Sequence, residues 1–130
     1  MDNLKKSFHR RELKAPCVAF SSPQGRSYFE EAQKAGTLEA YFPLSEHFTT
    51  QAHPAFCGLG SLSMMLNAFL VDPGRLWQGV WRWFDDSMLD CCEPLEKVQK
   101  NGINLSKLAC LARCNGMKCD LRYMDLVCEG

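Results

Sequence analysis

The segment from Cys57 to Leu70, CGLGSLSMMLNAFL, constrains the fold of this chain more than any other stretch. Its leucines and a phenylalanine recur at steps of three, four and three, which places them on one face of a helix. These four residues are Leu59, Leu62, Leu66 and Phe69. Because such an apolar face must be buried, we expect a helix over 57–70 that packs against the rest of the chain.

The length and charge of the chain narrow its class. It has 130 residues, enough for one domain with a hydrophobic core. Fifteen Lys and Arg balance fifteen Asp and Glu, so we expect no nucleic-acid partner. No apolar run approaches the roughly 18–20 residues that span a bilayer, and the N-terminus lacks the apolar stretch of a secretory signal. We therefore expect a cytoplasmic protein with no membrane partner.

Start and stop residues predict three further helices. Ser22 is a favoured N-cap and is followed by a proline, which fits the first helical position, so we expect a helix over 23–35. A second helix is expected over 95–101, between a proline and a glycine. A third is expected over 105–115, where the Asn104 side chain can cap the first turn.

Other segments lack a helical period. Apolar and charged residues alternate after Gly116, which predicts a half-buried strand over 117–123. Residues 76–90 are dense in tryptophan without a clean period, so we expect irregular structure that can include a short helix, with the tryptophans in the core. Residues 1–15 carry many Lys and Arg and are expected to form a flexible leader before a domain over 16–130. Three aspartates are interpreted as caps and surface charges: Asp85, Asp86 and Asp90.

Eight cysteines make up about 6% of the chain, below the roughly 8–10% typical of a disulfide scaffold. Without an export signal they are expected to be thiols, buried as small hydrophobes by default. Cys110 and Cys114 stand four apart on one helical face, a spacing that can chelate a metal, although burial beside Leu111 explains them equally. Adjacent Cys91 and Cys92 are poorly placed for joint ligation, but they can share a soft cation with a thiolate substrate.

The stretch QAHPAFCG, residues 51–58, contains the strongest candidate for chemistry. A thiolate in the first turn of a helix is stabilised by the helix dipole and by free amides, which makes Cys57 a candidate nucleophile. Gly58 leaves the thiol uncrowded and lets a substrate backbone approach. Gln51 could place its side-chain amide beside the Cys57 backbone N–H as a second oxyanion donor. By spacing alone, a core helix that happens to begin with a cysteine explains the pattern as well.

Longer strings around this motif resemble the N-terminal catalytic domain of phytochelatin synthases. They lie between about Phe20 and Lys118 and read TQAHPAFCGLGSLSMMLNAF, VDPGRLWQGVWRWFDDSMLDCCEPLEKV and GINLSKLACLARCNG. The resemblance implies an α+β, papain-like fold. This chain would hold mainly the helical N-terminal half of that fold and the start of its sheet.

The resemblance also implies dipeptidyl transfer on glutathione. Cys57 would attack the Cys–Gly peptide bond, release glycine, and pass the γ-glutamylcysteinyl group to a second glutathione or a growing phytochelatin. Gln51 and the Cys57 amide would hold the oxyanion. Heavy-metal ions (Cd, Zn, Cu) would act as activators that arrive as glutathione thiolates, with no organic cofactor. Four cysteines match family positions and are the candidate metal ligands: Cys91, Cys92, Cys110 and Cys114.

A papain-like site also needs a His and an Asp or Asn from the second half of the domain. The three histidines, His9, His47 and His53, all precede Cys57. We therefore interpret residues 16–130 as a catalytic domain truncated at its C-terminus, and we expect the isolated chain to be inactive or very weak. His53 is interpreted as a residue at the rim of the substrate site or as one with no particular role.

Glutathione carries two carboxylates, so its pocket should offer cations. Arg75 and Arg82 lie beside the tryptophans and are the candidates, and of these Arg82 is kept as a substrate-binding residue. Two other functions stay open: a non-catalytic, thiol-rich heavy-metal binder, and a regulatory half-domain that self-associates through an exposed apolar seam.

Overall fold

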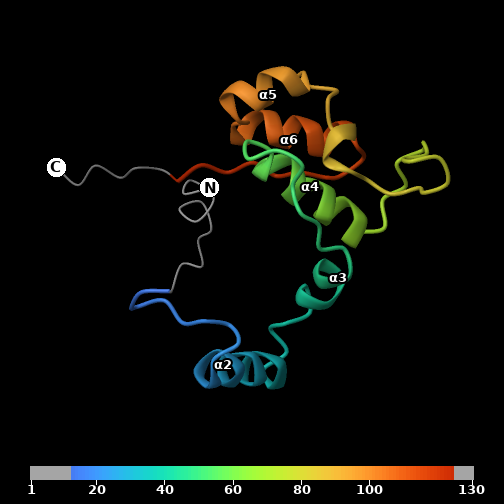
Figure 1. Cartoon of the computed structure of the whole chain (residues 1–130). Coiled ribbons are helices and arrows are strands. Elements are labelled where there is room, and N and C mark those ends of the chain that lie inside the picture. Colours follow the sequence, from blue (N-terminus) through green and yellow to red (C-terminus); the bar gives the residue numbers. More distant parts are fainter. Residues whose placement is uncertain (1–12, 125–130) are drawn as a thin grey trace, which may run out of the picture. The chain divides into compact units, whose positions relative to one another are not determined.

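The computed structural model describes residues 13–124, which form short helices joined by loops (Figure 1). Apart from an isolated antiparallel bridge between Trp77 and Trp81, residues 13–124 contain no β-structure. The chain divides into two compact units, Met1–Ala40 and Tyr41–Gly130. None of the helices within 13–124 has the length and apolarity needed to cross a lipid bilayer. The predicted leader over 1–15 lies mostly outside the described residues.

The first unit contains α2 (Pro23–Lys34), which confirms the helix predicted from its cap. The Ser22 hydroxyl accepts a hydrogen bond from the Gly25 amide at 3.1 Å and donates one to the Ala19 carbonyl at 2.7 Å. Gly25 is buried, and a Cβ there would lie 2.3 Å from the same carbonyl oxygen. Ser22 and Gly25 thus fix where the preceding loop meets the helix.

The second unit is built on α4 (Cys57–Ala68), as its apolar stripe predicted. Leu59 and Leu66 are fully buried in a core cluster that also takes in Leu89, Val98 and Leu111. α4 contacts α3 (Tyr41–Glu46), the 3-10 helix η1 (Asp86–Met88) and α6 (Leu105–Cys114). Phe69, the last residue of the predicted stripe, lies past the end of the helix and is exposed. α4 is therefore the element on which the second unit is assembled.

The two helices that follow η1 also begin and end where their caps predict. α5 (Leu95–Asn101) starts after Pro94 and ends at Gly102, whose φ of 67° suits a residue without a Cβ. α6 starts after Asn104, whose side chain accepts a hydrogen bond from the Lys107 amide at 2.9 Å. Figure 1 shows α5 and α6 beside α4.

Two expectations about the remaining segments are wrong, and one observed helix was not expected. Burial alternates along 117–122 as a strand would require, but no strand partner occurs within the described residues, so the segment is extended without a ladder. The tryptophans do not lie in the core as expected: Trp81 and Trp83 are 48% and 40% exposed. The tryptophan rings pack on one another instead of on the core, with centroids 5.1 Å apart for this pair. α3 was not predicted, since its six residues include a proline and bury no side chain.

The packing of Gly58 in α4 gives a test of this arrangement. A Cβ at Gly58 would lie 2.6 Å from Cγ2 of Ile103. We expect Gly58→Ala to lower the free energy of unfolding by up to about 2 kcal/mol, because the overlap outweighs the higher helix propensity of alanine. In an Ile103→Ala background the same change should be neutral or stabilising. Urea unfolding of the four proteins checks this coupling, and equal effects in both backgrounds would contradict it.

Candidate functional site

Cys57 is the first residue of α4, and its free thiol is exposed. Phe56 occupies the N-cap position and makes no side-chain capping hydrogen bond, while its carbonyl accepts the Gly60 amide at 2.7 Å. Phe56 itself is buried in the core cluster and anchors this end of the helix. The thiol therefore sits at the positive end of a twelve-residue helix whose first amides have no capping side chain.

A tight turn leads into the helix. The His53 carbonyl accepts the Phe56 amide at 2.9 Å, and Nδ1 of His53 accepts the Ala55 amide at 3.1 Å. Because Nδ1 is an acceptor, a neutral His53 carries its proton on Nε2. The imidazole also packs against the Phe56 ring, with centroids 5.3 Å apart. These contacts hold the imidazole within its own turn, and the assignment of His53 to a substrate rim stays a prediction.

Gln51 lies against the first turn of α4. A Cβ added to Gly60 of α4 would lie only 3.4 Å from the Cβ of Gln51. Its Nε2 donates to the carbonyls of His53 and Pro54, both at 2.9 Å, so both amide hydrogens stabilise the turn. Gln51 is thus next to the first turn of α4, but an oxyanion would have to compete with these two carbonyls for its amide, and its role as a donor stays a prediction.

Asp86 supports this loop from a distant part of the sequence. Its Oδ2 accepts the Ala52 amide at 2.9 Å, across 34 positions of sequence. The residue is 4% exposed, and Oδ1 has no hydrogen-bond partner in the described part of the chain. The interpretation of Asp86 as a surface charge is wrong, because η1 turns it inward, whereas Asp85 does cap η1 by accepting the Ser87 amide.

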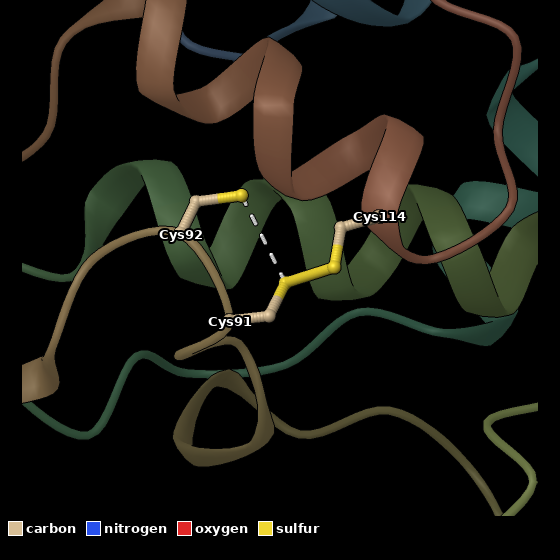
Figure 2. Close-up of side chains that lie close together, drawn as sticks. All are labelled: Cys91, Cys92 and Cys114. Atoms are coloured by element: carbon tan, nitrogen blue, oxygen red, sulfur yellow. Dashed lines mark hydrogen bonds between the residues drawn. A yellow bond between two sulfur atoms is a disulfide. The ribbon is translucent and has the colours of Figure 1, made fainter.

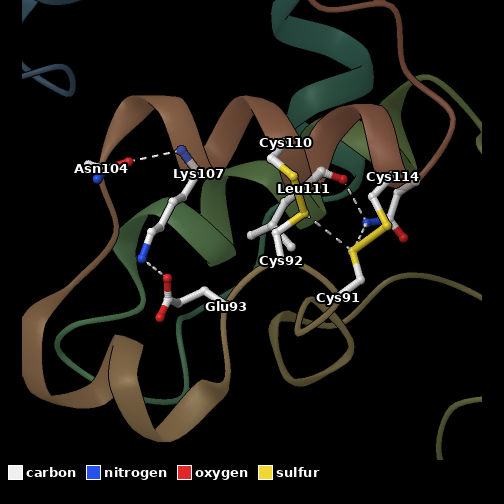
Figure 3. Close-up of a disulfide and its surroundings, with 9 residues drawn as sticks. Cys91, Cys92, Glu93, Asn104, Lys107, Cys110, Leu111 and Cys114 are labelled. Carbon is white, nitrogen blue, oxygen red and sulfur yellow. Dashed lines mark hydrogen bonds and ion pairs between the residues drawn. A yellow bond between two sulfur atoms is a disulfide. The ribbon is translucent and has the colours of Figure 1, made fainter.

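Four of the cysteines form a second cluster on α6 and the loop before α5. Cys91 is joined to Cys114 and Cys92 to Cys110 by disulfides; Figure 2 shows the first bond, and Figure 3 shows both. We call these four residues the cysteine cluster. The expectation that they are thiols is wrong for this structure, because the fold brings the adjacent pair alongside α6 and each member meets a different α6 cysteine. Cys17, Cys57 and Cys119 are free, and Cys128 lies outside the described residues.

The cysteine cluster would offer thiolate ligands to a soft metal ion only with its disulfides reduced. The sulfurs of Cys91, Cys92 and Cys114 lie within 4.8 Å of one another. Thiolates are the ligands preferred by Zn²⁺, Cu⁺ and related soft ions. Next to the cluster, the buried carboxylate of Glu93 pairs with Lys107 of α6 (Figure 3). That ion pair ties the same loop to the same helix and satisfies the buried charge.

Arg82 pairs with an acidic side chain. Its Nε and Nη2 donate to the two carboxylate oxygens of Asp72 at 2.7 and 2.6 Å, and both side chains are more than half exposed. The hydrogen bond from Arg82, followed by that from the Gly74 amide, holds the pKa of Asp72 below its ordinary value. Arg75 donates to the Met88 carbonyl. A substrate carboxylate at Arg82 would have to displace Asp72 or share the guanidinium with it.

Two neighbouring pockets lie near this pair. One of about 480 Å³ and one of about 390 Å³ share His47, Asn67 and Trp83 in their walls. The second is also lined by Arg82, and Cys57 lines neither. A third, mostly apolar pocket of about 460 Å³ lies between α4, α6 and the 117–122 segment.

A free, exposed cysteine thus lies at the start of α4, and the side-chain amide of Gln51 lies in the loop before it. The family model for phytochelatin synthase matches residues 8–128. The chain therefore belongs to the phytochelatin synthase family, as the sequence motifs suggested.

Named relatives agree with this assignment. Glutathione gamma-glutamylcysteinyltransferase 3 of Lotus japonicus is 56% identical over 109 residues, 83% of this chain and 23% of that protein. Glutathione gamma-glutamylcysteinyltransferase 1 of Arabidopsis thaliana is 55% identical over 113 residues, which are 86% of this chain and 23% of that protein. The glutathione gamma-glutamylcysteinyltransferase of Schizosaccharomyces pombe is 51% identical over 115 residues, which are 88% of this chain and 28% of that protein. The chain thus spans about a quarter of the length of these relatives. No solved structure matches it.

The Asp72–Arg82 pair predicts a measurable titration. A carboxyl with a lowered pKa stabilises the fold above its ordinary pKa, and the contribution is lost as the pH falls through the lowered value. We expect Arg82→Gln to raise the pKa of Asp72 towards its ordinary value, because the largest cause of the shift is removed. NMR titration of the carboxyl carbon measures this, and an unchanged Asp72 pKa in the variant would show that the pair does not persist in solution.

The Asp86–Ala52 hydrogen bond predicts a local effect near Cys57. Removing its charged acceptor should cost about 1–3 kcal/mol of stability and free the Ala52 amide. We expect Asp86→Ala to speed hydrogen exchange of that amide at least tenfold, while Asp90→Ala, an exposed control, should leave it unchanged. Equal exchange rates in wild type and Asp86→Ala would mean that Asp86 does not hold the loop.

Proposed function

We propose that this chain carries the nucleophilic half of a glutathione γ-glutamylcysteinyltransferase site, with Cys57 as the residue that becomes acylated. The observation that supports this most strongly is the position of Cys57: a free, exposed thiol at the first residue of α4. The names of relatives that are 51–56% identical supply the substrate class, glutathione. The papain-like arrangement of the complete site is part of the same proposal.

In the first step the Cys57 thiolate attacks the carbonyl carbon of the Cys–Gly peptide bond of glutathione. The C–N bond breaks, the glycine amine leaves with the proton that the Cys57 thiol gave up on ionising, and a γ-glutamylcysteinyl thioester remains on Cys57. In the second step the amine of another glutathione, or of a phytochelatin, attacks the thioester and loses a proton, and the Cys57 thiolate leaves and takes a proton up. One peptide bond is broken and one is formed, and no redox change occurs.

The helix start supplies part of what this chemistry needs. Amides in the first turn of α4 and the helix dipole favour negative charge on a tetrahedral oxyanion formed there. Gln51 is proposed as the second oxyanion donor, which requires it to release one of its bonds to the 53–54 turn. The missing side chain of Gly58 makes room for Ile103, so its contact with substrate is proposed through its backbone alone.

Proton transfer is the step that these residues support least. No His follows Cys57 in the 130 residues, and His53 is held in its own turn. Positioned acid–base groups are worth about 10²–10⁴ in rate. We therefore propose that the chain is acylated slowly and turns over weakly or not at all.

Several accompanying proposals concern the surroundings of the reaction. Heavy-metal ions (Cd, Zn, Cu) are proposed to arrive bound to glutathione thiolates, with phytochelatin peptides as products, in the cytoplasm. Arg82 is proposed to bind a glutathione carboxylate.

Self-association of the chain stays a prediction. It is supported by apolar side chains exposed beside the third pocket, such as Met65 at 42% and Leu105 at 51%.

The test is mass spectrometry of the chain after incubation with glutathione and cadmium ion. We expect a γ-glutamylcysteinyl adduct that maps to Cys57, because this thiol is both free and exposed. Cys57→Ser should abolish the adduct, and Cys17→Ser, which removes another exposed free thiol, should not. Phytochelatin formation is expected to be at least about 10²-fold slower than with a full-length relative assayed in parallel.

Two outcomes would count against the proposal. Metal binding without any Cys57 adduct would favour the alternative, a non-catalytic, thiol-rich heavy-metal binder or regulatory half-domain. The cysteine cluster is the observation that keeps this alternative open. Robust phytochelatin synthesis by the purified chain would instead contradict the expected loss of turnover, and would mean that residues within it complete the acid–base machinery.

A further inference from the structure

Asn67 of α4 holds the segment that precedes η1. Its side-chain amide donates to the Phe84 carbonyl at 2.9 Å, and its side-chain oxygen accepts the Phe84 amide at 2.8 Å. The Phe84 side chain is buried in the core cluster. These contacts fix the chain, two residues before Asp86, to the body of the helix that begins with Cys57.

Asp86 connects this fixed segment to the loop before the same helix. η1, which contacts α4, turns the Asp86 side chain inward, and its Oδ2 accepts the Ala52 amide at 2.9 Å. The residue is 4% exposed, and within residues 13–124 it has no ion pair and its Oδ1 has no hydrogen-bond partner. A buried carboxyl group with an unpartnered oxygen is unfavourable for folding. The contact with the loop before Cys57 is therefore the feature of Asp86 that calls for an explanation.

We infer that Asp86 is a positioning residue for Gln51, the proposed oxyanion donor, and this inference rests on the proposed acyl transfer at Cys57. The Ala52 amide belongs to the planar peptide unit that also contains the Gln51 carbonyl. The hydrogen bond from this amide to Asp86 therefore fixes the orientation of that unit, and with it the backbone from which the Gln51 side chain extends. In this role Asp86 acts through Gln51 and makes no contact with the substrate.

The 51–56 loop is held at both ends. Asp86 binds its start, and at its end Phe56 is buried and donates its amide to the His53 carbonyl at 2.9 Å. Between these points the Gln51 side chain donates to the carbonyls of the 53–54 turn. To reach an oxyanion, Gln51 must release one of these carbonyls while its backbone stays in place. With the start of the loop fixed, that change is a side-chain rotation and not a rearrangement of the loop, which is what a preorganised donor requires.

The test measures acylation of Cys57 by glutathione in the 130-residue chain, with the γ-glutamylcysteinyl adduct followed over time by mass spectrometry. Loss of the donor in Gln51→Ala should slow acylation by about 10²-fold, and its misplacement in Asp86→Ala by at least about tenfold. Asp86→Asn keeps an acceptor for the Ala52 amide and should stay within about threefold of wild type. In a Gln51→Ala background, Asp86→Ala should have less than about a twofold further effect, because no donor remains to be positioned.

Alkylation of Cys57 by iodoacetamide separates positioning from loss of the fold. Alkylation forms no oxyanion, so Asp86→Ala should leave its rate within about twofold of wild type while acylation falls. Asp90→Ala, an exposed control, should change neither rate. A parallel change of both rates in Asp86→Ala would overturn the inference, as would a full effect of Asp86→Ala in the Gln51→Ala background.

A second variant covers the case in which Asp86→Ala fails to fold. Asp86→Ser keeps a polar group at the buried position, but its side chain is too short to hold the Ala52 amide in the same place. We expect Asp86→Ser to show the same loss of acylation, the same alkylation rate as wild type, and the same dependence on Gln51. Acylation at the wild-type rate in Asp86→Ser would overturn the inference.

NMR of the Gln51 side-chain amide gives a readout that does not require acylation. In wild type we expect nuclear Overhauser contacts from this amide to the 53–54 turn, because both of its hydrogens are bonded there. Asp86→Ser should weaken them and Asp86→Asn should retain them, and unchanged contacts in Asp86→Ser would overturn the inference. Absence of any adduct on wild-type Cys57 would instead contradict the proposed function, and the NMR contacts would then decide whether Asp86 holds Gln51.

Discussion

Burial of the inner face of α4 is the interaction on which the second unit depends. Leu59 and Leu66 are completely buried, and each stabilises the folded state by about 1.5–3 kcal/mol relative to an exposed side chain. Between them Ser63 is also fully buried, and its hydroxyl donates to the Gly60 carbonyl at 2.8 Å, so no polar group is left unsatisfied there. α6 and η1 contact the same helix. Because the core begins at Phe56 and Leu59, the residue between them that starts the helix can remain at the surface, and that residue is Cys57.

The features that the sequence predicted correctly are local ones. Ser22 and Asn104 each accept an amide within three residues, so the cap can be recognised from a few neighbouring letters. The stripe of α4 repeats every three or four residues, and its first three leucines are buried as expected. The identity of Cys57 as the residue at the helix start follows from the same local pattern.

The features that the sequence did not predict depend on contacts between distant segments. Asp86 reaches the Ala52 amide across 34 positions, and no local pattern separates it from its neighbour Asp85, which is a cap. The alternation over 117–122 was read correctly as a pattern of burial, but a strand also needs a partner at the right distance. Pairing of the cysteines likewise requires the 91–92 loop to lie along α6, which neither segment specifies alone.

Cys57 and the cysteine cluster therefore lie in chemically different environments. Cys57 is a single free thiol at the exposed start of α4, whereas the cluster cysteines share neighbours and bond to one another. Each disulfide closes a loop of about 20 residues, a constraint worth roughly 3 kcal/mol, although the two loops are nested and their effects do not add fully. α6 is also held by contacts that do not involve sulfur, because Leu111 and Ala112 are buried in the core and Glu93 pairs with Lys107. Since these contacts do not involve sulfur, the cluster can change its bonding state without removing the apolar support of the helix that presents Cys57.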